Sequence, residues 1–362
     1  MTVRILTGDC REVLKTLPDE SVHCIVTSPP YFGLRDYGVD GQIGLEPSPA
    51  EFVEEMVAVF REARRVLRSN GTLWLNLGDS YANDGKWGGH TGGKHAAALH
   101  ASPIGRNKKY TGLKPKDLIG VPWRVAFGLQ SDGWWLRQWH PWVKRNPMPE
   151  STTDRATSAC EIVFMLSKSE RYFFNYDALK RTMAPASETR FAQDIENQIG
   201  SNRADGGKKT NGRMKAVRGD KQRGHSRRHA GFNDRWDAMS REEQCGTRAF
   251  RNSDLFYDSL TPPFGAIAGP DGLIALDVAP QPFKEAHFAT FPPKLIAPLI
   301  LGGCPEDGTV LDPFGGSGTT GLVADRLGRN AVLIELNPAY VEIARKRIEG
   351  DAPMLSSVEV AA

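Results

Sequence analysis

Residues 309–335, TVLDPFGGSGTTGLVADRLGRNAVLIE, form the stretch of sequence that decides the fold. A short apolar segment ends in Asp312, a glycine-rich turn leads into a helical segment, and a second apolar segment ends in Glu335. Glycine lets the backbone of such a turn approach a ligand closely, and the first turn of a helix presents free N–H groups. The stretch therefore predicts a βαβ unit that binds a nucleoside.

The turn differs from the two common phosphate-binding patterns, GxGxxG and GxxxxGK[ST]. Its pattern is Asp-Pro-Phe-x-Gly-x-Gly, with Asp312, Phe314, Gly316 and Gly318 at the fixed positions. At the tip of the second strand, the carboxylate of Glu335 stands where an acid can accept hydrogen bonds from both ribose hydroxyls.

Working outward, the chain alternates between apolar strands and helices. A long helix with one apolar face is expected at 49–67, after a proline that favours the first helical position. This alternation predicts a mostly parallel α/β sheet covered by helices on both faces. The expected strands are 3–7, 22–27, 72–77, 134–140, 161–167, 309–312 and 330–335.

A second motif follows the strand at 22–27. Ser28-Pro29-Pro30-Tyr31 joins a hydroxyl, two prolines that cannot continue a strand ladder, and an aromatic ring. The Ser28 oxygen and nearby backbone carbonyls can accept hydrogen bonds from an amino group, and Tyr31 can stack on a planar base. Open α/β sheets bind ligands at the carboxyl ends of their strands, so we expect this motif beside the glycine-rich turn.

The two motifs together resemble those of the DNA amino-methyltransferases that use S-adenosylmethionine. Their order, residues 27–31 first and 312–320 near the C-terminus, is similar to the circularly permuted beta group of that family. The resemblance implies a Rossmann-like methyltransferase fold with a mixed, mostly parallel, seven-stranded sheet and an inserted target-recognition region. Shorter matches lie at 8–10, 76–80, 144–150 and 291–294.

The resemblance also implies which residues bind the cofactor. Glu335 would hold the ribose hydroxyls, Asp9 would face the adenine ring, and Phe291 would help to close over the methionine end. Thr319 would reach the methionine carboxylate at the helix start. The full set assigned to S-adenosylmethionine is Asp9, Cys10, Phe291, Lys294, Asp312, Phe314, Gly316, Gly318, Thr319 and Glu335.

The catalytic residues implied by the resemblance are Ser28, Pro29, Pro30 and Tyr31. Ser28 and the Pro29 carbonyl would accept the two N–H bonds of an exocyclic amine and aim its lone pair at the methyl group. The base would leave the duplex and stack on Tyr31. No cysteine follows a proline in the chain, which argues against the covalent route of C5-cytosine enzymes.

The target base follows from the first residue of the motif. In the family, serine there accompanies cytosine N4 more often, and aspartate or asparagine accompanies adenine N6. The expected reaction is therefore methylation of cytosine N4 in duplex DNA, with adenine N6 as the alternative. Methyltransferases of protein glutamine or structured RNA are disfavoured by the motif order. A DNA-binding protein that has lost catalysis is disfavoured by the intact Asp9, Ser28, Tyr31, Phe314 and Glu335.

Charge is concentrated in one part of the chain. Residues 203–235 contain 11 lysines and arginines against 3 acidic residues, whereas the whole chain carries only +3. Such a block favours an anionic partner, here the phosphates of double-stranded DNA. The expected DNA-binding residues are Lys208, Lys209, Arg213, Lys215, Arg223, Arg227 and Arg228.

The motifs divide the chain into four parts. We expect a catalytic part at 1–180 that includes a loop at 83–116, a target-recognition insert at 181–287, and a cofactor-binding part at 288–350. A tail at 351–362 is expected to be frayed.

The composition limits the cellular compartment and the class of protein that we expect. No apolar run reaches a membrane span, there is no secretory signal, and five scattered cysteines form no disulfide framework. A bacterial or phage-encoded cytoplasmic protein is expected. No metal is expected, since His90, His95 and His100 are poorly spaced for one on a helix. The sequence does not decide whether the protein has a cognate restriction endonuclease or none. It also leaves open whether the protein is a monomer or a homodimer.

Overall fold

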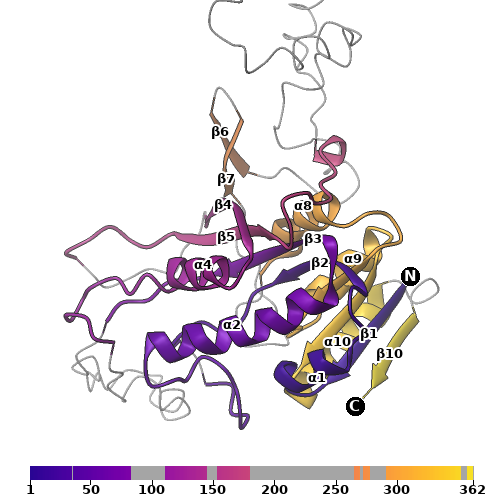
Figure 1. Ribbon diagram of the computed structural model, residues 1–362, viewed down its shortest axis with the longest axis horizontal. Helices are drawn as coiled ribbons and strands as arrows, with labels where there is room; N and C mark the ends of the chain where they lie inside the picture. The colour runs from indigo at the N-terminus through magenta and orange to yellow at the C-terminus, as the bar shows by residue number, and fades with distance from the viewer. Residues whose placement is uncertain are drawn as a thin grey trace, which may run out of the picture.

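A ten-stranded sheet runs through the protein in the order β10-β1-β9-β8-β2-β3-β5-β4-β7-β6 (Figure 1). It belongs to a computed structural model that describes residues 1–34, 36–82, 111–144, 153–179, 265–269, 272–277, 291–351 and 357–361. The strands are β1 (Thr2–Thr7), β2 (Val22–Thr27), β3 (Leu67–Leu77), β4 (Trp135–Val143), β5 (Cys160–Ser167), β6 (Gly265–Gly269), β7 (Gly272–Asp277), β8 (Thr309–Asp312), β9 (Asn330–Glu335) and β10 (Ser357–Ala361).

Most neighbouring strands are parallel, as the alternation of strands and helices predicted. The antiparallel pairs are β3 with β5, β5 with β4, and β6 with β7. The expected mixed, mostly parallel α/β fold is therefore confirmed. All seven expected strands are present, although β3 begins five residues earlier than its apolar run because it also contains residues 67–71.

The expected number of seven strands is wrong, because β6, β7 and β10 extend the sheet at its two ends. β6 and β7 form an antiparallel pair, and β7 pairs with β4 only at Trp142 and Val143. Residues 357–361, expected to fray, form β10 and pair in parallel with β1. Four of the five β10 residues are exposed, so no apolar pattern marked this segment as a strand.

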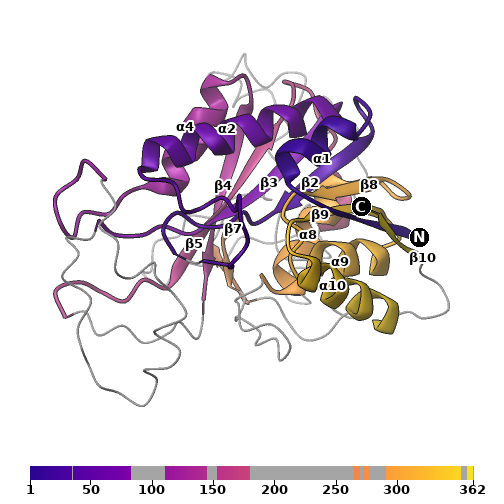
Figure 2. The same cartoon turned by 90° about the horizontal axis from the view of Figure 1, so that it is seen from below.

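Helices cover both faces of the sheet (Figure 2). One face carries α1 (Cys10–Thr16), α2 (Pro49–Val66) and α4 (Val121–Ser131). The other carries α8 (Pro293–Gly303), α9 (Thr319–Arg326) and α10 (Pro338–Asp351), with the short 3-10 helix η2 (Asp177–Leu179) beside α8. Within the described ranges, no helix combines the length and the apolar character that crossing a membrane requires.

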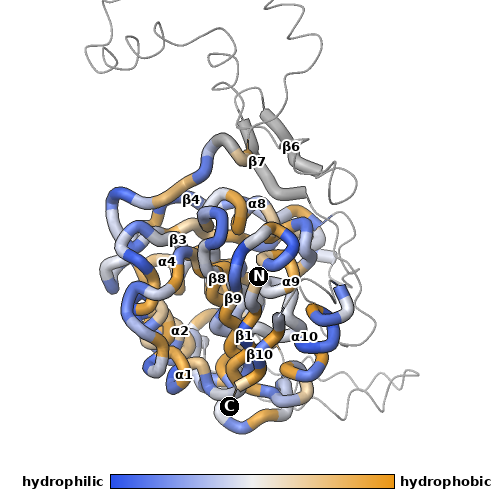
Figure 3. Tube along the Cα trace, turned by 90° about the vertical axis from the view of Figure 1, so that its right-hand side faces the viewer, coloured by the Kyte–Doolittle hydropathy of each residue, from blue (hydrophilic) through white to orange (hydrophobic). Residues whose placement is uncertain are grey.

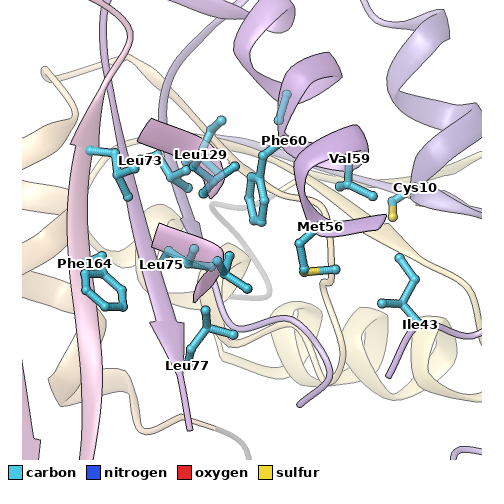
Figure 4. Close-up of a cluster of buried hydrophobic side chains, with 14 of the residues drawn as sticks. Cys10, Ile43, Met56, Val59, Phe60, Leu73, Leu75, Leu77, Leu129 and Phe164 are labelled. Atoms are coloured by element: carbon cyan, nitrogen blue, oxygen red, sulfur yellow. The ribbon is translucent and has the colours of Figure 1, made fainter. Parts of the chain in front are cut away.

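The long helix α2 shows how the sequence builds these layers. Ser48 caps it by accepting a hydrogen bond from the Glu51 N–H at 3.3 Å, and Pro49 occupies its first turn. Its apolar side chains recur at helical spacing, and Phe52, Met56 and Phe60 are fully buried. Figure 4 shows Met56 and Phe60 within the cluster of buried side chains between α2 and the sheet. Apolar residues likewise dominate the central strands, whereas polar residues gather on outer loops and helices (Figure 3).

The strand order brings the two sequence motifs together. β2, which ends at the Ser-Pro-Pro-Tyr motif, lies beside β8, which ends at the glycine-rich turn. Thr27 Oγ1 donates a hydrogen bond to Asp312 Oδ1 at 2.6 Å, across 285 residues of chain. On the other side of β9, Thr7 of β1 stands opposite Glu335. The carboxyl ends of four neighbouring strands thus converge at one edge of the sheet.

Candidate functional site

The buried side chain of Asp312 anchors the glycine-rich turn through hydrogen bonds. Its side chain is buried, and it accepts hydrogen bonds from Thr27 Oγ1 at 2.6 Å, from Thr320 Oγ1 at 2.6 Å and from the Phe314 N–H at 3.1 Å. Burial raises the pKa of Asp312 to about 6, although these hydrogen bonds act in the opposite direction. Asp312 therefore fixes where the turn begins.

Glycines shape the turn itself. Gly316 and Gly318 have φ angles of 49° and 78°, which other residues rarely adopt. A Cβ atom at Gly318 would lie 2.8 Å from the Cβ of Ala344, so α9 begins in close contact with α10. Thr319, the first residue of α9, accepts a hydrogen bond from Arg347 Nη1 at 2.8 Å. Both the conformation and the space at this turn require glycine.

Glu335 closes the opposite side of the turn. Its Oε2 accepts a hydrogen bond from the Gly316 N–H and its Oε1 one from the Asn337 N–H, both at 2.8 Å. Burial raises the pKa of Glu335. Each carboxylate oxygen can accept a further hydrogen bond, so the group still has acceptors for two hydroxyl donors. Two adjacent acceptors of this kind suit the two neighbouring hydroxyl groups of a ribose.

Asp9 caps α1 at the end of β1. Its Oδ1 accepts a hydrogen bond from the Arg11 N–H at 2.9 Å, and its Oδ2 accepts one from Arg11 Nη2 at 2.6 Å. Burial opposes ionisation here, but the hydrogen bonds from Arg11 prevail and the pKa of Asp9 is lowered. The same guanidinium donates to the Gly41 carbonyl at 2.7 Å and to Glu55 at 3.1 Å. Arg11 thus ties β1 to the loop after the catalytic motif.

One cavity joins these groups. Among the residues predicted to bind cofactor or perform catalysis, its walls include Asp9, Cys10, Ser28, Pro30, Phe291, Phe314, Gly316, Thr319 and Glu335. Pro29, Tyr31, Lys294, Asp312 and Gly318 do not line it. The cavity has a carboxylate, backbone amides and the apolar side chains of Ile43 and Ile334, a combination that suits an adenosine. The residues present therefore fit the nucleoside that the motifs predicted.

Several lining residues were missed in the sequence. One group lies beside Glu335 and consists of Ile334, Leu336, Asn337 and Tyr340. The other lies in the loop after the Ser-Pro-Pro-Tyr motif and consists of Tyr37, Val39, Gly41, Gln42 and Ile43. The first group was within reach of sequence reasoning, because it flanks Glu335. The loop from 37 to 43 has no periodicity, and only its position after the motif pointed to it.

Polar side chains of β3 and β5 hold the Ser-Pro-Pro-Tyr motif. Asn76 of β3 lies with its Nδ2 3.2 Å from Ser28 Oγ, 2.9 Å from the Tyr31 hydroxyl and 3.2 Å from Glu161 Oε2. The Tyr31 hydroxyl donates to Glu161 Oε2 of β5 at 2.6 Å, and Lys144, which directly follows β4, forms an ion pair with the other oxygen of Glu161. We call Ser28, Tyr31, Asn76, Glu161 and Lys144 the polar cluster.

The ring of Tyr31 is fixed by close packing, in addition to the hydrogen bonds of its hydroxyl. A Cβ atom at Gly78 would lie 2.5 Å from the Tyr31 ring, so the glycine of residues 76–80 gives the ring its place. Burial, together with the negative charge of Glu161, raises the pKa of the Tyr31 hydroxyl well above its ordinary value. Tyr31 is therefore a neutral phenol fixed at both ends. Sequence reasoning gave no role to Asn76 or Glu161.

The predicted DNA-binding residues lie outside the described part of the chain. They are Lys208, Lys209, Arg213, Lys215, Arg223, Arg227 and Arg228. The same holds for residues 145–150, for most of the loop at 83–116, and for the three histidines within it.

Comparison with known proteins identifies the family of this chain. The DNA methylase family model of the N6/N4 type matches residues 22–346. Type II methyltransferase M.Cfr9I of Citrobacter freundii is 39% identical over 347 residues, which cover 96% of this chain and 88% of the relative. Type II methyltransferase M.SmaI of Serratia marcescens is 36% identical and covers 95% and 90%, respectively.

Solved structures share the fold. The cytosine-N4-specific PvuII DNA methyltransferase gives a TM-score of 0.54 at 17% identity, covering 99% of this chain and 96% of that one. A DNA modification methylase of Thermus thermophilus, TTHA0409, in complex with S-adenosyl-L-methionine, gives 0.51 at 21% identity, covering 99% and 100%. At these sequence identities, the similarity to the two structures supports a shared fold and nothing more. The family model and the curated relatives go further, and by them this chain belongs to the N6/N4 family of DNA methylases.

Proposed function

We propose that this methyltransferase transfers a methyl group from S-adenosylmethionine to the exocyclic N4 of cytosine in duplex DNA. The observation that carries the proposal is that Ser28 lines the same cavity as Phe314 and Glu335. A hydroxyl therefore stands at the head of the catalytic motif, beside the surface that suits the cofactor. The acceptor of the methyl group and its donor can meet there.

The cofactor supplies a methyl group bound to a positively charged sulfur. In the proposed arrangement, Glu335 accepts the ribose hydroxyls, Phe314 and Phe291 flank the cofactor, and Asp9 with Cys10 faces the adenine ring. The residues then act by position, because transfer between two held groups gains most from proximity and alignment.

The amino group needs help because its lone pair is delocalised into the base. Ser28 Oγ keeps an acceptor lone pair after the hydrogen bond from Asn76, so it can accept one N–H of the amine. The Pro29 carbonyl would accept the second. Two such hydrogen bonds favour a pyramidal nitrogen whose lone pair points at the methyl group. The base must leave the duplex to reach this position, with Tyr31 stacked on it.

Duplex DNA would be held largely by the basic block at 203–235, which suits phosphate neutralisation. The curated relatives are named Type II methyltransferases, and we infer the same class for this chain, which would pair it with a restriction endonuclease of the same specificity. Digestion of DNA from expressing and non-expressing cells with candidate nucleases tests that pairing, because only the methylated DNA should resist the matching nuclease.

The experiment for the main proposal is expression in a host that lacks DNA methylation, followed by digestion of the DNA to nucleosides and mass spectrometry. We expect N4-methyldeoxycytidine. N6-methyldeoxyadenosine alone would refute the assignment of the base and establish the adenine alternative. Absence of both products, in DNA from cells that contain folded protein, would refute DNA methylation. A Ser28→Ala strain is the matched control and should give neither product.

A further inference from the structure

We propose that Glu161 is the terminal acceptor of the proton that methylation releases, and that the hydroxyls of Ser28 and Tyr31 carry the proton to it. The inference rests on the proposed placement of the target amine against Ser28. It applies equally to cytosine N4 and adenine N6, since both are exocyclic amines.

The reaction itself creates the need for such an acceptor. The amine lone pair forms the new N–C bond, and the electron pair of the broken S–C bond stays on sulfur. The nitrogen is then positively charged and holds one proton too many. A serine hydroxyl is too weak a base to keep this proton, so it has to be passed on.

The polar cluster provides a continuous path. The Tyr31 hydroxyl donates to Glu161 Oε2 at 2.6 Å, and the hydroxyls of Ser28 and Tyr31 lie side by side, 3.2 Å and 2.9 Å from the same Asn76 Nδ2. The nitrogen proton can pass to Ser28 Oγ while the Ser28 proton passes to Tyr31 and the Tyr31 proton passes to Glu161. Both hydroxyls are restored, and the one net change is a protonated Glu161 carboxyl.

Asn76 sets the direction of this path. Glu161 can only accept, so the Asn76 Nδ2, which lies 3.2 Å from Glu161 Oε2, is the donor side of the amide. The same Nδ2 lies within hydrogen-bond distance of Ser28 Oγ and of the Tyr31 hydroxyl, and its two hydrogens can be donated to these two oxygens. Each hydroxyl hydrogen is then left to point along the path toward the carboxylate.

Two further observations point to a ligand at this place. Asn76 is 5% exposed, and its Oδ1 has no hydrogen-bond partner within the described part of the chain. An unpaired buried acceptor is costly, which favours a hydrogen-bond donor that arrives from outside the protein. Glu161 is itself nearly buried, with a side-chain exposure of 14%, yet β5 is otherwise an apolar strand. Its charge is balanced by Lys144, whose ion pair uses Oε1 and leaves Oε2 to the path.

The test compares Tyr31→Phe, Glu161→Gln and the double variant in single-turnover methylation of duplex DNA. Tyr31→Phe keeps the aromatic ring and removes only the hydroxyl, so a residue that merely stacks would tolerate it. We expect each single variant to lose about 100-fold in rate, the usual lower range for a lost proton acceptor. The double variant should be no slower than the slower single variant, because both changes interrupt one path.

Two further measurements separate this role from a structural one. Fluorescence of 2-aminopurine at the target position should show unchanged base flipping in both variants. Glu62→Gln, which removes one of the two acidic partners of Arg65 on α2, is the matched control and should keep the wild-type rate.

A Tyr31→Phe rate within threefold of wild type would overturn the proposal, as would multiplied losses in the double variant. If Glu161→Gln lowers the melting temperature strongly, the Tyr31→Phe result decides. These outcomes are independent of the base assignment, because rates are compared on whichever base the wild type methylates. A product at adenine N6 would refute the proposed target and leave the proton path to be judged by the same ratios.

Discussion

Replacement of Asp312 by asparagine should remove a pH-dependent loss of stability from the cofactor turn. Asp312 is buried, and its folded-state pKa of about 6 stands above the ordinary value of 3.8. A carboxyl with a raised pKa binds its proton more strongly in the folded chain than in the unfolded one. Its contribution to stability is therefore fully present below pH 3.8 and is lost as the pH rises through 6.

The magnitude follows from the two pKa values. One pKa unit corresponds to about 1.4 kcal/mol, so complete ionisation of Asp312 costs the folded state about 3 kcal/mol. Asparagine has the same shape and does not ionise. Its Oδ1 can still accept from Thr27 and the Phe314 N–H, and its amide can donate to Thr320 Oγ1 once that hydroxyl turns.

The assay is urea denaturation of wild type and Asp312→Asn at about pH 4.5 and about pH 7.5, followed by tryptophan fluorescence. The free energy of unfolding of the variant, relative to wild type, should rise by about 2 kcal/mol between the two pH values, because about 1 kcal/mol of the cost is already present at the lower one. Asp19→Asn, at a carboxyl whose side chain is 74% exposed, is the control and should show no such rise. A difference between Asp312→Asn and wild type that stays constant with pH would refute the reasoning.

Three further changes test other parts of the site. Ser28→Ala should abolish methyl transfer, because the amine loses an acceptor, while isothermal calorimetry should show cofactor affinity within about threefold of wild type; a clear loss of affinity would contradict the assignment. Glu335→Ala should weaken cofactor binding at least about 10-fold, since charged hydrogen bonds contribute about 1.5–3 kcal/mol each, and an unchanged dissociation constant in calorimetry would exclude its role at the ribose. Gly303→Ala should lower stability by about 1–3 kcal/mol or more in urea titration, because its Cβ would lie 2.5 Å from Trp74 Nε1. Gly350→Ala, in open space on α10, should be neutral or slightly stabilising, and equal effects of the two changes would argue against the packing shown here.

The cofactor half of the site was predictable because its signals are local. Residues 309–335 contain the strand, the turn, the helix and the closing acid in one continuous run, and the structure reproduces that order. What the motif does not indicate is how Asp312 is used. The carboxyl lies beneath the turn and bonds Thr27 and Thr320, outside the cavity walls.

The half of the candidate site around the Ser-Pro-Pro-Tyr motif was only partly predictable because it is assembled by strand register. Glu161 reaches Tyr31 because β5 runs antiparallel to β3, with Leu77 opposite Ile162. Nothing in the sequence near Tyr31 specifies that pairing. The one available signal was a charged residue at the head of an apolar strand, which is unusual in a buried sheet. The loop at 37–43 gave no signal, because its residues meet the cavity through turns rather than through any periodic pattern.

The hydrogen bond between Thr27 and Asp312 has a consequence for folding during synthesis. It joins the neighbouring strands β2 and β8 across 285 residues, and β1 is separated from its partners β9 and β10 by an even longer stretch of chain. During synthesis the catalytic motif leaves the ribosome long before any of these neighbours exists. The exposed edges of β1 and β2 must be protected through that interval, and closure of long loops makes such pairing slow. The cavity is complete only when β8 and β9 are in place, so a chain that ends before them lacks the walls formed by Phe314 and Glu335.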